Sequence, residues 1–203
     1  MDMKKIMHDT LILFVICIIS GLLLGAAYEI TAPITAERKA QEKAQGYKEV
    51  FVDGVDFEYE DAIVADVENS EAILEAAGLK GARVTDCMTV KDASGTVLGY
   101  AMSVASNGKE GEMITAVCYG VDGVVRGIKI LESSETPGLG SLAEEPEFTD
   151  QFKDKTVESF EVVKGGAGED GQVECLNGAT LTSNAVVLAA NAGIAFAQHC
   201  MSK

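Results

Sequence analysis

The 203-residue sequence has few basic residues, no tryptophan and only two histidines. Its 16 Lys and Arg residues stand against 32 Asp and Glu residues, which gives a formal net charge of −16. Because proteins hold a phosphate backbone with clustered Lys and Arg, this balance disfavours nucleic acid as a partner. The 21 glycines follow no Gly-X-Y period, which excludes a collagen-like chain. A hydrophobic content of 47% is typical of a folded protein.

The five cysteines show no metal-binding spacing. No two of them form a C-x-x-C pair, and two histidines are too few for a histidine site, so we predict no metal site. Cys87 and Cys118 fall within strand-like runs, where buried thiols are common. We therefore expect free buried thiols, with disulfides as the alternative if the domain lies outside the cytoplasm.

A long uncharged run near the N-terminus predicts a membrane anchor. Residues 10–28 are 19 residues without a formal charge, about 28 Å of helix, which is close to the thickness of a bilayer core. The alternative is a cleaved signal peptide, with Lys4 and Lys5 as its basic region and residues 25–27 as its cleavage site. The run is longer than a signal peptide's apolar region, which favours a retained anchor. Lys4 and Lys5 favour a cytoplasmic N-terminus, because positive charge gathers on the cytoplasmic side of a span. The basic residues within 38–48 reduce the difference in positive charge between the two sides.

The remainder of the chain predicts an acidic domain on a helical connection. Residues 31–203 carry 14 basic and 29 acidic side chains, a net charge of −15. Pro33 fits the first turn of a new helix, and residues 34–51 are rich in Ala, Glu, Lys and Gln. We expect a transmembrane anchor over 1–30, a connecting helix over 31–52 and an extracytoplasmic domain over 53–203.

The hydrophobic pattern predicts an α+β fold with one N-terminal transmembrane helix, an antiparallel sheet and flanking helices. Strands are expected over 84–91, 97–104, 112–119, 124–131 and 157–163. Turn sequences at 92–96 and 121–123 join the first four strands into two hairpins. Helices are expected over 70–77, with Ser70 as cap, and over about 182–199, with a short helix or turn over 148–155. Residues 53–69 are weakly patterned, and 164–171 is a glycine-rich loop.

Two loops have compositions that suit a ligand. The loop 135–141 holds two glycines and a proline, which let the backbone approach a flat ligand closely; an ordinary surface turn is the alternative. The segment 174–183 crowds small residues before the last helix, with Thr182 or Ser183 as the expected N-cap. A helix N-terminus favours an anion such as a phosphate beside Thr180; simple capping is the alternative.

At these residues the chain resembles the G subunit of the Rnf electron-transport complex, which is related to the C subunit of the sodium-pumping NADH:quinone reductase. The family motif for covalent flavin attachment is Asp-x-x-(Ser/Thr)-Gly-Ala-Thr, and its last Thr carries FMN through a phosphoester bond. The matching run here is 174–180, with Glu174 in place of Asp and Asn177 in place of Ser or Thr. The loop 135–140, the segment 151–153 and the N-terminal anchor also resemble the family, so the likeness covers essentially the whole chain.

The resemblance implies that Thr180 carries covalent FMN, as a tether rather than a catalytic nucleophile, so no catalytic residue is expected. It implies a non-catalytic redox subunit that relays electrons from ferredoxin toward NAD in an inner-membrane complex, coupled to sodium or proton translocation. The expected partners are other subunits of the complex, a flavin transferase for maturation and the lipid bilayer around residues 10–28. The alternatives are a C-type subunit of a quinone reductase and an anchored binding module without redox function. The implied cofactor-binding residues are Thr180, Glu135, Thr136, Pro137, Gly138, Leu139, Gly140, Leu176, Asn177, Gly178, Ala179, Leu181 and Thr182.

Overall fold

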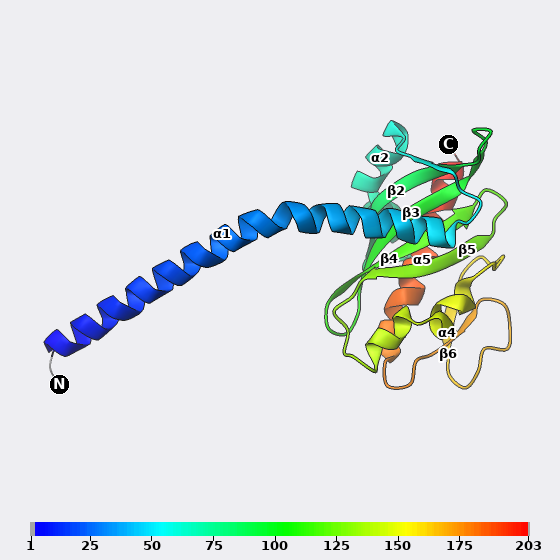
Figure 1. Cartoon of the computed structure of the whole chain (residues 1–203). Coiled ribbons are helices and arrows are strands. Elements are labelled where there is room, and N and C mark those ends of the chain that lie inside the picture. The colour runs from blue at the N-terminus through cyan, green and yellow to red at the C-terminus, as the bar shows by residue number, and fades with distance from the viewer. Residues whose placement is uncertain (1–2, 203) are drawn as a thin grey trace. The chain divides into compact units, whose positions relative to one another are not determined.

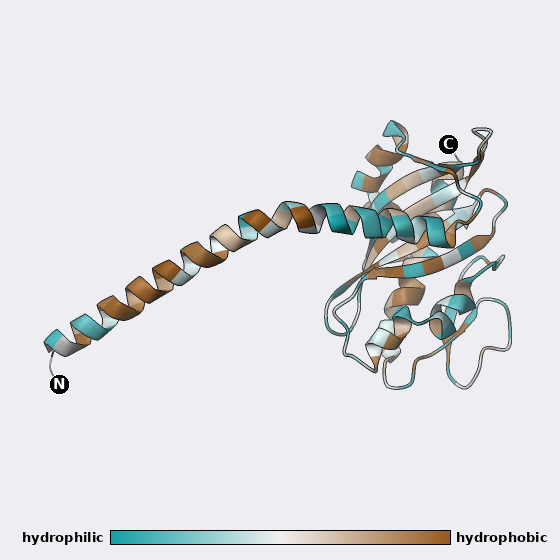
Figure 2. Ribbon diagram, viewed as in Figure 1, coloured by the Kyte–Doolittle hydropathy of each residue, from teal (hydrophilic) through white to brown (hydrophobic). Residues whose placement is uncertain are grey.

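A computed structural model of the chain describes residues 3–202 and begins with a long helix, α1 (Met3–Val50) (Figure 1). Its N-terminal part is strongly apolar, and none of its most apolar stretch is buried (Figure 2). The expected start of a new helix at Pro33 is wrong, because α1 continues through that residue. Proline inside a helix removes one hydrogen bond and crowds the carbonyl four residues earlier, and α1 continues past Pro33 despite both effects. Residue contacts divide the chain into two compact units, 1–42 and 43–203.

The second unit is built on an antiparallel sheet whose strand order follows the sequence. Its strands are β1 (Asp56–Glu58), β2 (Ala82–Lys91), β3 (Val97–Asn107), β4 (Glu112–Gly120) and β5 (Val125–Glu132). The four long strands confirm the two predicted hairpins and the α+β class. A small parallel pair, β6 (Glu161–Val163) and β7 (Gln172–Glu174), leads into the last helix, α5 (Thr180–Met201).

Short helices fill the connections. They are α2 (Asp61–Glu68), α3 (Ser70–Ala76), η1 (Gly140–Glu144), α4 (Pro146–Thr149) and η2 (Asp150–Phe152). The weak pattern of 53–69 thus concealed a strand and a helix. The expected cap at Ser70 is also wrong, since Asn69 holds that position. The Ser70 hydroxyl instead donates to the carbonyl of Val84 and accepts from its N–H, which ties α3 to β2.

One face of the sheet is covered by α5. Met102, Val104 and Val117 of the sheet belong to the same buried cluster as Val186 and Phe196 of the helix. Gly193 makes the close approach possible, because a Cβ there would come within 2.6 Å of a Val117 methyl group. The helix predicted over 182–199 is therefore α5, a core helix, and its packing fixes the N-terminal end of α5 relative to the sheet.

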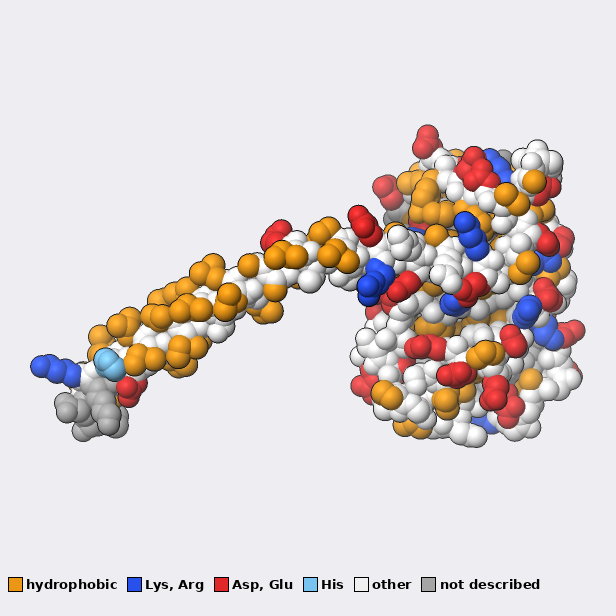
Figure 3. Space-filling model, viewed as in Figure 1, with side chains coloured by type: hydrophobic (Ala, Val, Ile, Leu, Met, Phe, Trp, Pro, Cys, Tyr) orange, Lys and Arg blue, Asp and Glu red, His pale blue; other side chains and the backbone are white. Residues whose placement is uncertain are grey.

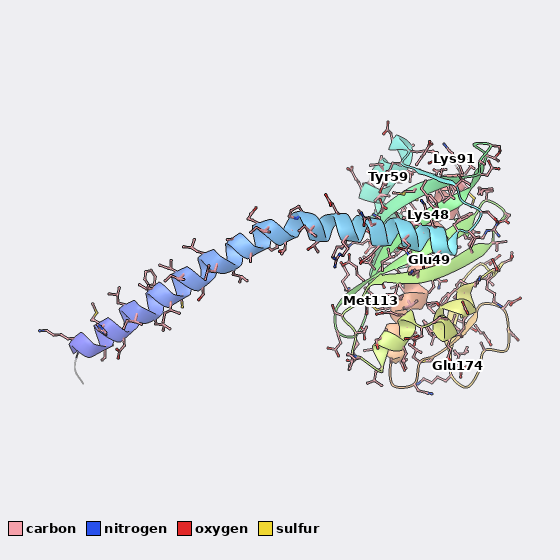
Figure 4. All side chains as sticks on the ribbon, viewed as in Figure 1. Lys48, Glu49, Tyr59, Lys91, Met113 and Glu174 are labelled. Carbon is pink, nitrogen blue, oxygen red and sulfur yellow. The ribbon has the colours of Figure 1, made fainter. Side chains whose placement is uncertain are left out.

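The opposite face is covered by the last turns of α1, which belong to the second unit (Figures 1 and 4). Tyr47 and Phe51 are buried there against the sheet. Lys43 forms an ion pair with Asp86 of β2 at 2.6 Å, and Glu49 pairs with Lys129 of β5. The sheet therefore lies between two helical layers, the end of α1 and α5.

The cysteines follow the prediction in part. Cys87 and Cys118 are buried in β2 and β4, and none of the five cysteines, all within residues 3–202, forms a disulfide bond. Burial raises the pKa of the Cys118 thiol, so this cysteine stays protonated and unreactive.

Candidate functional site

The two predicted loops meet at the N-terminal end of α5. A side chain on Gly178 would come within 3.3 Å of Leu139 Cδ2, and one on Gly140 would come within 3.0 Å of Thr182 Oγ1. The structure thus brings the segment after β5 together with the segment after β7, although more than thirty residues separate them in the sequence.

The first loop contains a tight turn at 136–139. The Leu139 N–H donates to the Thr136 carbonyl at 3.2 Å, with Pro137 second and Gly138 third in the turn. Gly138 has a φ of +76°, as the third position of a type II turn requires. Its N–H donates to the Ser141 hydroxyl at 2.9 Å. The turn leaves Pro137, Gly138 and Leu139 exposed at the surface.

Glu135 anchors this loop from inside. Its side chain is buried, and its Oε2 accepts a hydrogen bond from the Thr182 hydroxyl at 2.8 Å. Its Oε1 accepts from the backbone N–H groups of Lys109 and Glu110, at 2.6 and 3.1 Å. Glu135 therefore joins three segments: its own loop, the β3–β4 turn and the first turn of α5.

Three hydroxyl side chains at the start of α5 differ sharply in accessibility. Thr182 and Ser183 are fully buried at 0% exposure, whereas Thr180 is partly exposed. The Ser183 hydroxyl accepts from the Leu176 N–H at 3.0 Å and donates to the Ala179 carbonyl at 3.1 Å. Thr180 Oγ1 lies 3.5 Å from the Cys175 sulfur, which is its donor. Of the three residues, Thr180 alone has exposed surface, so its side chain is the one that a reaction partner can approach.

The first turn of α5 is not capped by a side chain. The helix begins at Thr180 with Ala179 as N-cap, so the expected cap at Thr182 or Ser183 is wrong. Alanine has no side-chain acceptor, and the first N–H groups of a helix have no partner within the helix. An anion on Thr180 would lie at this positive end, where an exposed charge gains about 0.3–1 kcal/mol.

A groove lies beside the second loop. It has a volume of about 770 Å³ and is lined by residues of the α4 region and of the loop: Leu142, Glu145, Pro146, Glu147, Phe148, Gln151, Glu174, Cys175, Leu176 and Asn177. Gln151 fixes one wall, because its Oε1 accepts from the Glu174 N–H at 2.6 Å. Figure 4 shows Glu174 among the loops on the α4 side of the domain. Apart from the family resemblance at 151–153, no sequence pattern indicated that the α4 region forms one wall of this groove, the α4 wall.

The site combines exposed apolar side chains with acidic ones. Leu139, Leu142 and Leu181 are 42%, 41% and 62% exposed. Acidic side chains are scattered over the face of the domain that Figure 3 shows, and the Glu110 N–H donates to Glu135 at the site. Its hydrogen bond and ion pair with Lys109 hold the pKa of the Glu110 carboxyl below its usual range. Within residues 3–202, no three His, Cys, Asp or Glu side chains are grouped to hold a metal ion.

The predicted site residues therefore fall into two groups. Glu135, Gly140, Ala179 and Thr182 are buried and support the site from inside. The others are partly or fully exposed around Thr180 and can face a ligand: Thr136, Pro137, Gly138, Leu139, Leu176, Asn177, Gly178 and Leu181. An accessible hydroxyl, an uncapped helix N-terminus, exposed leucines and an adjoining groove suit a phosphate ester with a flat apolar ring system.

Comparison with known proteins agrees with this geometry. Residues 108–195 match the FMN-binding domain family. The G subunit of the Na⁺-translocating ferredoxin:NAD⁺ oxidoreductase complex of Acetobacterium woodii is 30% identical, over 98% of this chain and 94% of its own. The G subunit of the proton-translocating ferredoxin:NAD⁺ oxidoreductase complex of Clostridium ljungdahlii is 29% identical, over 91% of this chain and 88% of its own.

A solved structure supports the fold. The C subunit of the Na⁺-translocating NADH-quinone reductase from Parabacteroides distasonis superposes with a TM-score of 0.52. The match covers 83% of this chain and 96% of that one at 16% identity. At this identity the likeness concerns the fold alone.

Proposed function

The chain belongs to the family of G subunits of ion-translocating ferredoxin:NAD oxidoreductase (Rnf) complexes, and on this premise we propose that Thr180 carries FMN through a covalent phosphoester bond. Its function is that of the electron-carrying, FMN-binding subunit of such a complex, with the other subunits as partners. The single observation that supports Thr180 most strongly is its partial exposure at the start of α5, where the other two hydroxyl-bearing residues are buried.

The attachment is a phosphoryl transfer to the Thr180 hydroxyl. The bond from Thr180 Oγ1 to phosphorus forms while a phosphoanhydride bond of an activated FMN donor, a flavin dinucleotide, breaks. The leaving nucleoside monophosphate takes the bonding electron pair, and the hydroxyl proton passes to a base of the flavin transferase. Removing this threonine therefore removes the only oxygen that the phosphate bridges to the chain.

The residues around Thr180 have separate roles in holding the group. The uncapped N–H groups of the first turn of α5 would hold the phosphate and offset its charge. The exposed side chains of Leu139 and Leu181 give the ring system an apolar surface. When bound, FMN supplies the electron-transfer chemistry, while the protein supplies position and electrostatics.

The acidic surface acts on the same cofactor. Glu110, Glu174 and the buried Glu135 place negative charge around the site. Negative charge disfavours the extra electrons of a reduced flavin, and the α5 N-terminus offsets part of this effect. The balance between the two sets how readily the domain gives up electrons.

The apolar N-terminal part of α1 supports a membrane location for the subunit. We infer that residues 10–28 cross the bilayer once and that the domain lies on the extracytoplasmic side, consistent with Lys4 and Lys5 on the cytoplasmic side. The second long apolar helix, α5, is two-thirds buried within the domain, which supports a single crossing. A covalent bond suits an extracytoplasmic domain, since free FMN would be lost by dilution there.

Mass spectrometry of the natively produced protein tests the proposal. We expect the peptide containing residues 174–183 to carry the mass of an esterified FMN, localised by fragmentation to Thr180. The intact mass also reports whether the N-terminal segment is retained. An unmodified peptide from cells that make the transferase would contradict the covalent assignment.

A further inference from the structure

We propose that Glu135 is a positioning residue that does not touch FMN but fixes the geometry in which Thr180 is presented. The proposal rests on the proposed attachment of FMN at Thr180. The sequence of the exposed loop suggests that Glu135 contacts the ligand. Its burial at 8% exposure and its hydrogen bonds place it behind the site instead.

The hydrogen bonds of Glu135 are directed away from solvent. Oε1 accepts from two consecutive backbone N–H groups, those of Lys109 and Glu110, and Oε2 accepts from the Thr182 hydroxyl. Hydrogen bonds to a charged group are stronger than those between neutral groups. One carboxylate therefore holds the three segments together at a single point, and the Thr136 hydroxyl adds a hydrogen bond to Glu110 between the 135–141 loop and the β3–β4 turn.

Two glycines show how closely the surrounding backbone approaches this carboxylate. A Cβ on Gly108 would collide with Glu135 Oε1, and a Cβ on Gly140 would collide with Oε2. The carboxylate thus fills the space between the β3–β4 turn and the start of η1. No larger group fits between them without displacing backbone.

The contact with Thr182 connects this support to Thr180. Thr182 is the third residue of α5, so its hydrogen bond fixes the first turn of the helix both in rotation and in position. Thr180 belongs to the same turn and points elsewhere, toward Cys175. If Glu135 is lost, the first turn of α5 can shift relative to the 136–140 loop, and the hydroxyl and the apolar surface no longer face the same volume.

Two substitutions separate the position of Glu135 from its charge. Glu135→Gln keeps an acceptor for the two N–H groups and offers its amide to Thr182, so the geometry is kept while the charge is lost. Glu135→Ala removes both. Thr182→Val removes only the hydroxyl donor at nearly constant volume, and it decides the question if Glu135→Ala does not fold. Glu144→Gln is the matched control, since it removes an exposed carboxylate in the neighbouring η1.

The first measurement needs no cofactor. In hydrogen exchange on the unloaded full-length protein, Glu135→Ala and Thr182→Val should lose protection at the first hydrogen-bonded amides of α5, beginning with that of Ser183, which donates to the Ala179 carbonyl. Glu135→Ala should also lose it at Lys109 and Glu110, while the buried strands keep theirs. Unchanged protection in both variants would overturn the positioning role, whatever the fate of the proposed FMN attachment.

The second measurement uses purified flavin transferase and a flavin dinucleotide. We expect Glu135→Ala and Thr182→Val to load FMN about tenfold or more slowly than the wild type, and Glu144→Gln at the wild-type rate. Glu135→Gln should load nearly normally, with a flavin midpoint potential shifted to more positive values, because a negative charge near the reduced flavin is gone. Wild-type loading rates in both Glu135→Ala and Thr182→Val would refute the inference, whereas a wild-type protein that takes up no FMN would refute the proposed function instead.

Discussion

The hydroxyl oxygen of Tyr47, near the end of α1, lies 2.7 Å from the hydroxyl oxygen of Ser103 in the middle of β3. The Tyr47 hydroxyl also donates to the Asp86 carboxylate at 3.3 Å. The same carboxylate accepts a hydrogen bond from the Tyr59 hydroxyl and forms an ion pair with Lys43. The helix α1 therefore ends inside the hydrogen-bonding network of the domain. Its last two turns are part of the domain fold.

A truncated chain that begins at Lys43 should fold, whereas one that begins at Asp53 should be much less stable. The shorter chain loses Tyr47 and Phe51, and the removal of one large aromatic side chain from a core costs about 3–5 kcal/mol. Urea unfolding followed by circular dichroism compares the two. Equal midpoints would show that the α1 layer contributes nothing to the stability of the domain.

Alkaline pH should destabilise the domain through Tyr47. Burial, followed by the nearby Asp86, raises the pKa of Tyr47 well above its usual value near 10. Above pH ~10 the unfolded chain loses this proton while the folded chain keeps it, so stability is full below that pH and falls by up to about 1.4 kcal/mol per pH unit above it. Unfolding free energies of the Lys43–Lys203 chain over pH ~8 to 11.5 measure the slope.

Two tyrosine variants show how much of this pH dependence comes from Tyr47 and how much from Tyr59. Tyr47→Phe should lower stability near neutral pH by about 1 kcal/mol and flatten the alkaline slope. Tyr59→Phe should flatten the slope less, because Tyr59 is 55% exposed and its pKa rises only to about 12, through burial and Asp86. An alkaline slope unchanged by Tyr47→Phe would assign it to other groups.

Gly140→Ala should destabilise the site and its surroundings. The new methyl group would come within 2.7 Å of the Glu135 Cβ and 3.0 Å of Thr182 Oγ1, so backbone must move. We expect a loss of about 1–3 kcal/mol in the free energy of unfolding. Gly168→Ala is the control, since its Cβ would meet only the Gln172 side chain at 3.9 Å. Equal stability of both variants would mean that the loop adapts freely.

Thr180→Ala should abolish covalent flavin while leaving the fold intact, because the side chain lies at the start of α5 outside the main core. Flavin fluorescence of the denatured polypeptide on a gel measures the bond, and circular dichroism measures the fold. Thr149→Ala is the control and should keep the covalent flavin. Thr180→Ser keeps a hydroxyl at this position and should carry at least part of the wild-type amount of flavin. Fluorescence that survives in Thr180→Ala would place the bond on another residue.

Gly138→Val should slow flavin reduction without removing the tether. Gly138 has a φ of +76°, which costs a β-branched residue about 1–2 kcal/mol, so the turn must rearrange beside Leu139. Gly165→Val carries the same kind of strain at a φ of +92° in the 164–171 loop. Stopped-flow reduction that is slowed equally in the two variants, or in neither, would argue against contact between the 136–139 turn and the flavin.

The sheet could be predicted well because its signals are local. Alternating apolar residues and the Asp122-Gly123 turn indicated the four long strands within a few residues. The prediction for 53–69 failed because α2 is short and acidic, and it is helical mainly through packing on β2. Helix caps failed for a similar reason: Ser70 and Thr182 have the right side chains for caps, but tertiary hydrogen bonds with Val84 and Glu135 use them instead.

Only part of the candidate site could be predicted from the sequence. The small residues before α5 pointed to Thr180, and the resemblance paired that segment with the 135–140 loop. No local pattern shows that the two meet, because their contact runs through a carboxylate and a buried hydroxyl distant in sequence. The α4 wall of the groove was missed for the same reason.

The start of α5 also determines which oxygen is offered for chemistry. Successive helical residues are rotated by about 100°, so Thr180 and Thr182 face nearly opposite directions. The phase of the helix is set by its packing on the sheet, which turns residue 182 into the domain and leaves residue 180 at the surface. Under the proposed attachment, the angular setting of one core helix therefore selects the residue that is modified.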